Sequence, residues 1–222
     1  DQQSEVWYEK GLVLSFLEDL LGSLKAYDRA LELNPQDAEV WYRRGNNLLK
    51  LQHYSEAIEA YRQAIALRPE DSEAWHNQGV ALERLGEFAA AMTAYDQAIA
   101  LDPHRLEPWF HRGNALGQLE DYQAAIAAYD RALSLHSQEQ SEDPSLISSI
   151  WFNRGTILAQ LKQHESALES YNRALQFNAD DAEIWTARGE MLERMQRYAE
   201  AVDAYDQVVT LEPENHQAWR HR

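Results

Sequence analysis

Cysteine is absent from this chain of 222 residues, and so is any long apolar run. Without cysteine the chain forms neither disulfides nor thiolate metal sites, which fits a reducing compartment such as the cytoplasm. Because no stretch approaches the roughly 20 apolar residues of a membrane-spanning helix, we expect no direct membrane insertion. The phosphate-binding glycine loop, the serine elbow and the paired-histidine zinc motif are missing too. We therefore expect no enzyme, no catalytic residue, no cofactor and no metal site.

Positive charge is also scarce. The chain has 20 Lys and Arg residues against 37 Asp and Glu residues, which gives a net charge of −17. An acidic surface repels the phosphates of nucleic acids and of anionic lipids, so we expect neither as a partner. The same charge favours a basic partner. A simpler interpretation is that acidic residues only fill helix starts and exposed loops.

Tryptophan, in contrast, recurs at a fixed spacing. The residues Trp7, Trp41, Trp75 and Trp109 are 34 positions apart, Trp151 follows after 42, and Trp185 and Trp219 return to 34. A period of this length indicates one helical unit that is copied along the chain. Other residues keep step with tryptophan, and in the second copy they are Trp41, Gly45, Ala57, Tyr61, Ala64 and Pro69.

The apolar residues of each copy recur at helical spacing on both sides of a short turn, which is Gln52-His53 in the second copy. This pattern predicts two antiparallel helices, with Asp37 as the cap of the first. A glycine inside a helix, such as Gly45, costs about 0.5–1 kcal/mol relative to alanine. We therefore expect the glycines to allow a close approach by the small residues at the positions of Ala57 and Ala64, with tryptophan rings filling the remaining space.

The pattern resembles the tetratricopeptide repeat over nearly the whole chain. The resemblance implies an all-α fold, a right-handed superhelical solenoid of antiparallel helix pairs. We expect a single solenoid over 1–222, with copies at about 4–37, 38–71, 72–105, 106–147, 148–181 and 182–215 and a partial copy at 216–222. Because the last copy is incomplete, we also expect the chain to be a fragment of a longer protein.

The step of 42 residues places an eight-residue insertion within about 136–147. Asp143-Pro144 is typical of a helix cap followed by the first helical residue. Asp143 precedes Trp151 by eight residues, whereas Asp37 precedes Trp41 by four. The spacing predicts a first helix about one turn longer than in the other copies, after a loop about four residues longer. Neutral drift, a bend or a partner contact would each explain the insertion.

A recurring departure from the family pattern lies three residues after tryptophan. There the family usually has an apolar residue, whereas this chain has Lys10, Arg44, Arg112, Arg154 and Arg188. Acidic residues recur in step with them, namely Asp28, Asp96, Asp130 and Asp206. The favoured interpretation is a ladder of ion pairs between neighbouring helices, and the alternative is a functional cationic stripe.

In relatives, the residues that follow tryptophan face a concave groove. The resemblance therefore gives the candidate partner-binding residues Tyr8, Tyr42, Arg43, Asn46, His76, Asn77, Phe110, His111, Asn114, Phe152 and Asn153. Aromatic rings with interleaved amides suit an extended peptide, whose backbone offers donors and acceptors. The alternative is that the aromatic residues only pack. His76 and His111 are interpreted as polar lining rather than as a metal site with Glu73 and Glu107.

These observations predict a non-catalytic scaffold that binds a partner protein or peptide in the groove. One alternative is the regulatory or targeting arm of an enzyme or assembly factor whose other domains lie outside these residues. A second is a structural module that self-associates through the ends of the solenoid.

Overall fold

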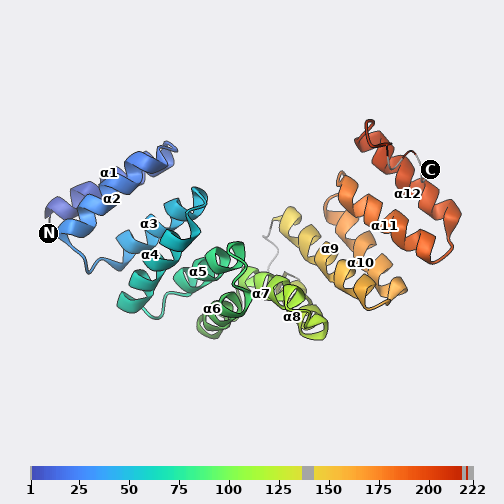
Figure 1. Cartoon of the computed structure of the whole chain (residues 1–222), viewed down its shortest axis with the longest axis horizontal. Coiled ribbons are helices and arrows are strands. Elements are labelled where there is room, and N and C mark those ends of the chain that lie inside the picture. The colour runs from blue at the N-terminus through green and yellow to red at the C-terminus, as the bar shows by residue number, and fades with distance from the viewer. Residues whose placement is uncertain (1, 137–142, 217–218, 220–222) are drawn as a thin grey trace. The chain divides into compact units, whose positions relative to one another are not determined.

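The computed structural model describes residues 2–136, 143–216 and 219, and within them the chain forms helices and no strand (Figure 1). The helices are α1 Gln2–Phe16, α2 Leu20–Leu33, α3 Ala38–Lys50, α4 Tyr54–Leu67, α5 Ser72–Arg84, α6 Phe88–Leu101, α7 Leu106–Gln118, α8 Tyr122–His136, α9 Pro144–Gln160, α10 His164–Phe177, α11 Ala182–Arg194 and α12 Tyr198–Leu211. They form two compact units, Asp1–Ala115 and Leu116–Arg222, whose boundary falls within α7. None of the described helices is at once long enough and apolar enough to span a membrane.

Antiparallel helix pairs are the building unit, as the sequence predicted. Between α3 and α4 the turn residue Gln52 has a φ of 61°, and the His53 amide donates to the Leu48 carbonyl at 2.9 Å. This arrangement is a Schellman motif, which ends a helix with one left-handed residue. The same position is left-handed in every pair, and only Gly86 among these residues is a glycine. The first helix of each pair carries the tryptophan, and we call these helices (α1, α3, α5, α7, α9 and α11) the first helices.

The glycines of α1, α3, α5, α9 and α11 make room for a tyrosine, not for the small residues that the sequence suggested. A Cβ added to Gly45 would lie 2.6 Å from the ring of Tyr61, and one added to Gly189 would lie 2.8 Å from the ring of Tyr205. Both rings are fully buried. Alanines 57 and 64 are buried as well and line the same interior. Tyrosine therefore fills the centre of the helix pair, and glycine is required because the ring lies against the backbone.

Tryptophan also has a different place from the one expected. The Trp41 side chain is only half-buried, and its Nε1 donates to the Pro35 carbonyl at 3.0 Å. Trp75 and Trp185 make the same bond to the residue six positions before them, at 2.9 and 2.8 Å. Each of these indoles therefore fastens the loop between two helix pairs, and the interior belongs to tyrosine.

The longer first helix after the insertion is confirmed. α9 has 17 residues where α3 and α11 have 13, and Asp143 caps it by accepting a hydrogen bond from the Ser145 amide at 2.9 Å. Pro144 is its first residue, where the missing N–H costs nothing. The rest of the predicted loop, residues 137–142, lies outside the described residues.

The first helix pair exposes an apolar face. Val6 is 65% exposed and Val13 is 57% exposed. The residues at the position of Val6 in two later copies, Val40 and Ile184, are buried against the preceding helix pair. A further helix would cover this face of α1 in the same way, which is the contact that the self-association alternative requires.

Candidate binding surface of the first helices

The aromatic side chains that follow tryptophan pack inside the helix pairs. Tyr42 is only 9% exposed, and its ring centroid lies 6.2 Å from that of the interior Tyr61. His76 with Tyr95 and Phe152 with Tyr171 repeat this contact, each at 5.9 Å, and Tyr8 with Tyr27 at 6.3 Å. Phe110 is 9% exposed. These rings therefore contribute to the packing of the helix pairs, and a contact of the same residues with a partner stays a prediction.

The candidate amides of the Asp1–Ala115 unit form an internal hydrogen-bond cluster. Asn77 Nδ2 donates to Asn46 Oδ1 at 3.0 Å and to the Tyr42 hydroxyl at 3.2 Å. Asn46 Oδ1 also accepts from the Tyr61 hydroxyl at 2.8 Å, and Tyr42 donates to Glu73 at 2.8 Å. Polar groups that satisfy one another in this way fix the spacing of neighbouring helices. We call Tyr42, Asn46, Tyr61, Glu73 and Asn77 the amide cluster.

His76 and His111 do meet, with ring centroids 5.3 Å apart, but the carboxylate beside them is not one of the expected pair. Glu83 accepts a hydrogen bond from Tyr95 at 2.6 Å and lies 3.2 Å from His111 Nδ1. The carboxylates named from the sequence are engaged elsewhere: Glu73 accepts from Tyr42, and Glu107 lies 3.7 Å from Arg105. Within the described residues no group of three or more His, Asp or Glu side chains has the arrangement of a metal site.

Burial controls the protonation of His76. Burial first, and then the nearby charges of His111 and Arg105, lower the pKa of His76 to about 3, so its imidazole is neutral at neutral pH. Burial opposes ionisation of Glu83, but the interactions with His111 and Tyr95 outweigh it and lower the pKa of this carboxyl. Glu83 thus joins Tyr95 and His111, whereas the buried Nδ1 of His76 has no hydrogen-bond partner among the described residues.

The cations three residues after tryptophan form the expected ion-pair ladder in three copies. Arg44 lies 2.8 Å from Asp28, Arg112 2.6 Å from Asp96 and Arg154 2.7 Å from Asp130, each across to the preceding second helix. Arg188 bonds instead to Asn172 at 2.8 Å. The second copy has Arg62 at the repeat position where other copies have the aspartate. The third copy, which follows it, has Gln78 where other copies have the cation. This matched exchange supports a structural role for the ladder.

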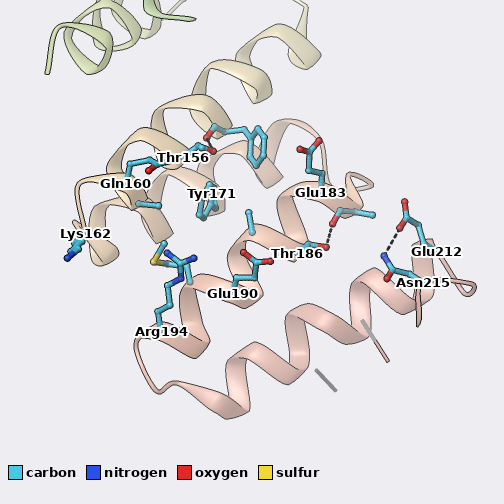
Figure 2. A pocket seen from close by; sticks show the side chains of 15 residues that line it. Thr156, Gln160, Lys162, Tyr171, Glu183, Thr186, Glu190, Arg194, Glu212 and Asn215 are labelled. Atoms are coloured by element: carbon cyan, nitrogen blue, oxygen red, sulfur yellow. Dashed lines mark hydrogen bonds between the residues drawn. The ribbon is translucent and has the colours of Figure 1, made fainter. Parts of the chain in front are cut away.

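Two pockets open on the first helices, one in each unit. In the Asp1–Ala115 unit a pocket of about 410 Å³ has three of the candidate residues in its lining, namely Arg43, Asn46 and Asn77. The exposed Arg43 is bonded to Glu39 at 2.7 Å. In the Leu116–Arg222 unit a pocket of about 650 Å³ lies between α9 and α11, and we call it the α9–α11 pocket (Figure 2). Both volumes fall in the range of about 300–1,000 Å³ that is typical of ligand sites.

The sequence prediction missed most of the α9–α11 pocket. Phe152 is its only candidate residue, whereas the lining also includes Thr156, Gln160, Lys162, Glu183, Glu190 and Arg194. Asn114 and Asn153 are half-buried on α7 and α9, and neither lines the two pockets described. For two of the missed residues the signal was present, since Thr156 and Glu190 lie five residues after tryptophan, as the candidates Asn46 and Asn114 do.

Comparisons with known proteins agree with this architecture. Models of the tetratricopeptide repeat match residues 4–37, 42–105, 105–179 and 182–215. A search of curated proteins finds no match. PilW, described as a widely conserved type IV pilus biogenesis factor, is 18% identical with a TM-score of 0.81, over 99% of this chain and 98% of that one.

Two other solved structures differ in how much of them this chain covers. YrrB, described as a TPR protein with an unusual peptide-binding site, is 18% identical with a TM-score of 0.69, over 89% of this chain and 97% of that one. The APC/C hetero-tetramer Cut9–Hcn1 is 19% identical with a TM-score of 0.76 over 99% of this chain. The chain spans only 42% of that relative's length. At these identities the likeness shows the fold.

Proposed function

The chain belongs to the tetratricopeptide repeat family, and we propose that it is a non-catalytic scaffold that binds another protein through the pockets on its first helices. The observation that carries this proposal is the α9–α11 pocket of about 650 Å³. Two parallel first helices line it along their length, and exposed polar and charged side chains surround a wall that includes Phe152 and Met191. Such a lining suits a peptide segment, which offers backbone polar groups and alternating side chains.

Two of the similar structures support the same class of function. YrrB is described as having a peptide-binding site, and PilW as a biogenesis factor of a pilus, which is a protein assembly. A scaffold of this kind needs only a surface, and the first helices supply one in each unit.

A pocket-filling variant tests the proposal. Thr186 lies in the pocket wall with its hydroxyl turned to its own helix, donating to the Ala182 carbonyl at 2.8 Å. Arginine at this position would extend into the pocket and displace a bound segment. We expect affinity purification with the unaltered chain to retain a partner protein that Thr186→Arg loses, with at least a tenfold reduction in recovery.

Thr210 offers a matched control. It lies exposed on α12, and its hydroxyl makes the same type of bond, to the Asp206 carbonyl at 2.8 Å. Thr210→Arg adds the same charge and volume away from the pocket and should leave recovery unchanged. Equal recovery of every partner by Thr186→Arg would show that the α9–α11 pocket does not bind them.

A further inference from the structure

The α9–α11 pocket has opposite charges at its two ends. Lys162 and Arg194 lie at the carboxyl ends of the first helices, Lys162 in the turn after α9 and Arg194 in the last turn of α11. Glu183 lies in the first turn of α11, and Glu212 follows α12. Figure 2 shows Lys162 and Arg194 on one side of the pocket and Glu183 and Glu212 on the other. A bound segment would therefore meet cations at one end and anions at the other.

Glu212 accepts a hydrogen bond from Asn215 at 2.9 Å. Among the residues that the structure describes, no ion pair involves the other three charges, Lys162, Arg194 and Glu183. By contrast, Arg154 of the same unit is paired with Asp130 at 2.7 Å. In a chain with 37 acidic and only 20 basic residues, cations are the charges that most readily find an internal partner. Two cations left at one end of a pocket are therefore available to an external anion.

The helix dipole gives part of the reason for this placement, because cations are favoured at helix carboxyl ends and anions at amino ends. That preference is met by any position in the terminal turn, whether it faces a pocket or open solvent. Arg194 and Glu183 instead occupy the positions that line the pocket. The dipole therefore accounts for the sign of each charge but does not require that the charges face the pocket.

The distance between the charged ends sets the length of the occupant. Glu183 and Arg194 are eleven residues apart on α11, which corresponds to about 16 Å at 1.5 Å per residue. An extended chain covers the same distance in about five residues at roughly 3.3 Å each. Between the ends the wall includes Phe152, Ala187 and Met191, and Thr186 turns its hydroxyl to its own helix. The exposed Glu190 lies one turn before Arg194. The middle of the pocket thus suits small or apolar side chains beside one acidic group.

We propose that the α9–α11 pocket binds an extended internal segment of a partner protein in which an acidic and a basic side chain stand about five residues apart. The acidic side chain binds at Lys162 and Arg194, and the basic one at Glu183 and Glu212. The inference rests on the proposed function of the chain as a protein-binding scaffold. It also refines the sequence expectation of a basic partner, because the pocket requires both signs of charge.

Selection from a peptide library tests this specificity. The probe is a library of nine random residues displayed in a loop between two folded flanks, so that no chain terminus can enter the pocket. Selected against the unaltered chain, the enriched sequences should carry an acidic and a basic residue four to six positions apart. Selected against the double variant Lys162→Glu, Arg194→Glu, they should lose the acidic residue, and the first set should bind this variant at least tenfold more weakly.

A matched double variant controls for net charge. Arg131→Glu with Arg173→Glu on α8 and α10 changes the net charge by the same amount outside the pocket and should enrich the first set of sequences. Enriched sequences without paired charges, but still lost in Thr186→Arg, would overturn this inference and leave the proposed function standing. If no enriched sequence is lost in Thr186→Arg, both fail. Identical charge preference in the pocket double variant would also overturn the inference.

Discussion

The two units have the same helix pairs but use the polar side chains of their first helices differently. In the Asp1–Ala115 unit, Asn46 and Asn77 hydrogen-bond to each other and to buried tyrosines. In α11 of the Leu116–Arg222 unit the same repeat positions carry Glu190 and Ala187, both of which line the α9–α11 pocket. These positions line a pocket in both units, but in the Asp1–Ala115 unit their side chains also join neighbouring helices.

This difference shows that a repeat position does not by itself decide the role of its side chain. The interior is common to both units, with a glycine under the ring of a buried tyrosine in each. The first-helix surface varies from copy to copy because its side chains are not needed to fill the interior. A polar side chain there stabilises the stack only where a neighbouring copy supplies a partner, as Asn77 does for Asn46.

The largest expected effect comes from breaking the amide cluster. Asn46→Ala removes the acceptor of the Tyr61 hydroxyl and one of the two acceptors of Asn77, which keeps its bond to Tyr42. A buried donor left without a partner costs about 1–3 kcal/mol, and a lost hydrogen bond about 0.5–1.5 kcal/mol. We expect the free energy of unfolding to fall by about 3 kcal/mol, the sum of the Tyr61 and Asn77 contributions. Glu190→Ala, at the same position of the other unit, should change it by less than about 0.5 kcal/mol. Urea denaturation followed by circular dichroism measures both, and equal losses would remove the contrast between the units.

The next effect depends on pH and belongs to His76. Burial lowers the pKa of this side chain in the folded state to about 3, below the ordinary value of about 6.5 in the unfolded chain. As the pH falls below 6.5 the unfolded chain binds a proton that the folded chain does not, so the stability of the fold decreases. Between pH 7 and pH 5 the loss from this group is about 2 kcal/mol. The groups that face His76, namely His111, Glu83 and Arg105, are unchanged in the test.

Phenylalanine is the suitable replacement, because Phe110 and Phe152 occupy the same repeat position in later copies. We expect His76→Phe to lose about 2 kcal/mol less than the unaltered chain when the pH is lowered from 7 to 5. Thr186→Phe, at the equivalent position of the other unit, should retain the full pH dependence. Urea denaturation at the two pH values gives the comparison. If His76→Phe retains it too, this histidine is not the group that takes up the proton.

The period of the sequence was sufficient to predict the helix pairs, the ion-pair ladder and the longer α9. These features depend on residues that are neighbours on one helix or that recur in step, so spacing alone determines them. The prediction gave tryptophan the interior place that tyrosine occupies in the structure. Spacing shows that both rings recur, but it does not show which one lies against Gly45. The backbone geometry decides that, by placing Tyr61 on the glycine and Trp41 over the loop.

The candidate surface was less predictable for a related reason. Tyr42 and Asn77 were assigned to the groove from their position after tryptophan, but whether a side chain faces a ligand depends on which partner stands opposite in the next copy. Asn77 lines the pocket of its unit but also bonds to Asn46 of the preceding copy, whereas Arg194 has no ion-pair partner among the described residues. Such pairing crosses from one copy to the next, and a pattern within one copy does not reveal it.

The smallest expected effect is the difference in stability loss between variants of two cations in the Leu116–Arg222 unit, Arg154 and Arg194. Arg154 is mostly buried, pairs with Asp130 at 2.7 Å and donates to the Ser170 hydroxyl at 2.8 Å, so Arg154→Gln should lower the free energy of unfolding by about 1 kcal/mol. Arg194→Gln should change it by less than about 0.5 kcal/mol, because the exposed guanidinium has no ion pair among the described residues. Thermal or urea denaturation of the two variants measures the difference. A loss for Arg194→Gln as large as that for Arg154→Gln would mean that the pocket cation already serves the fold, and the contrast between a structural and an available charge would then disappear.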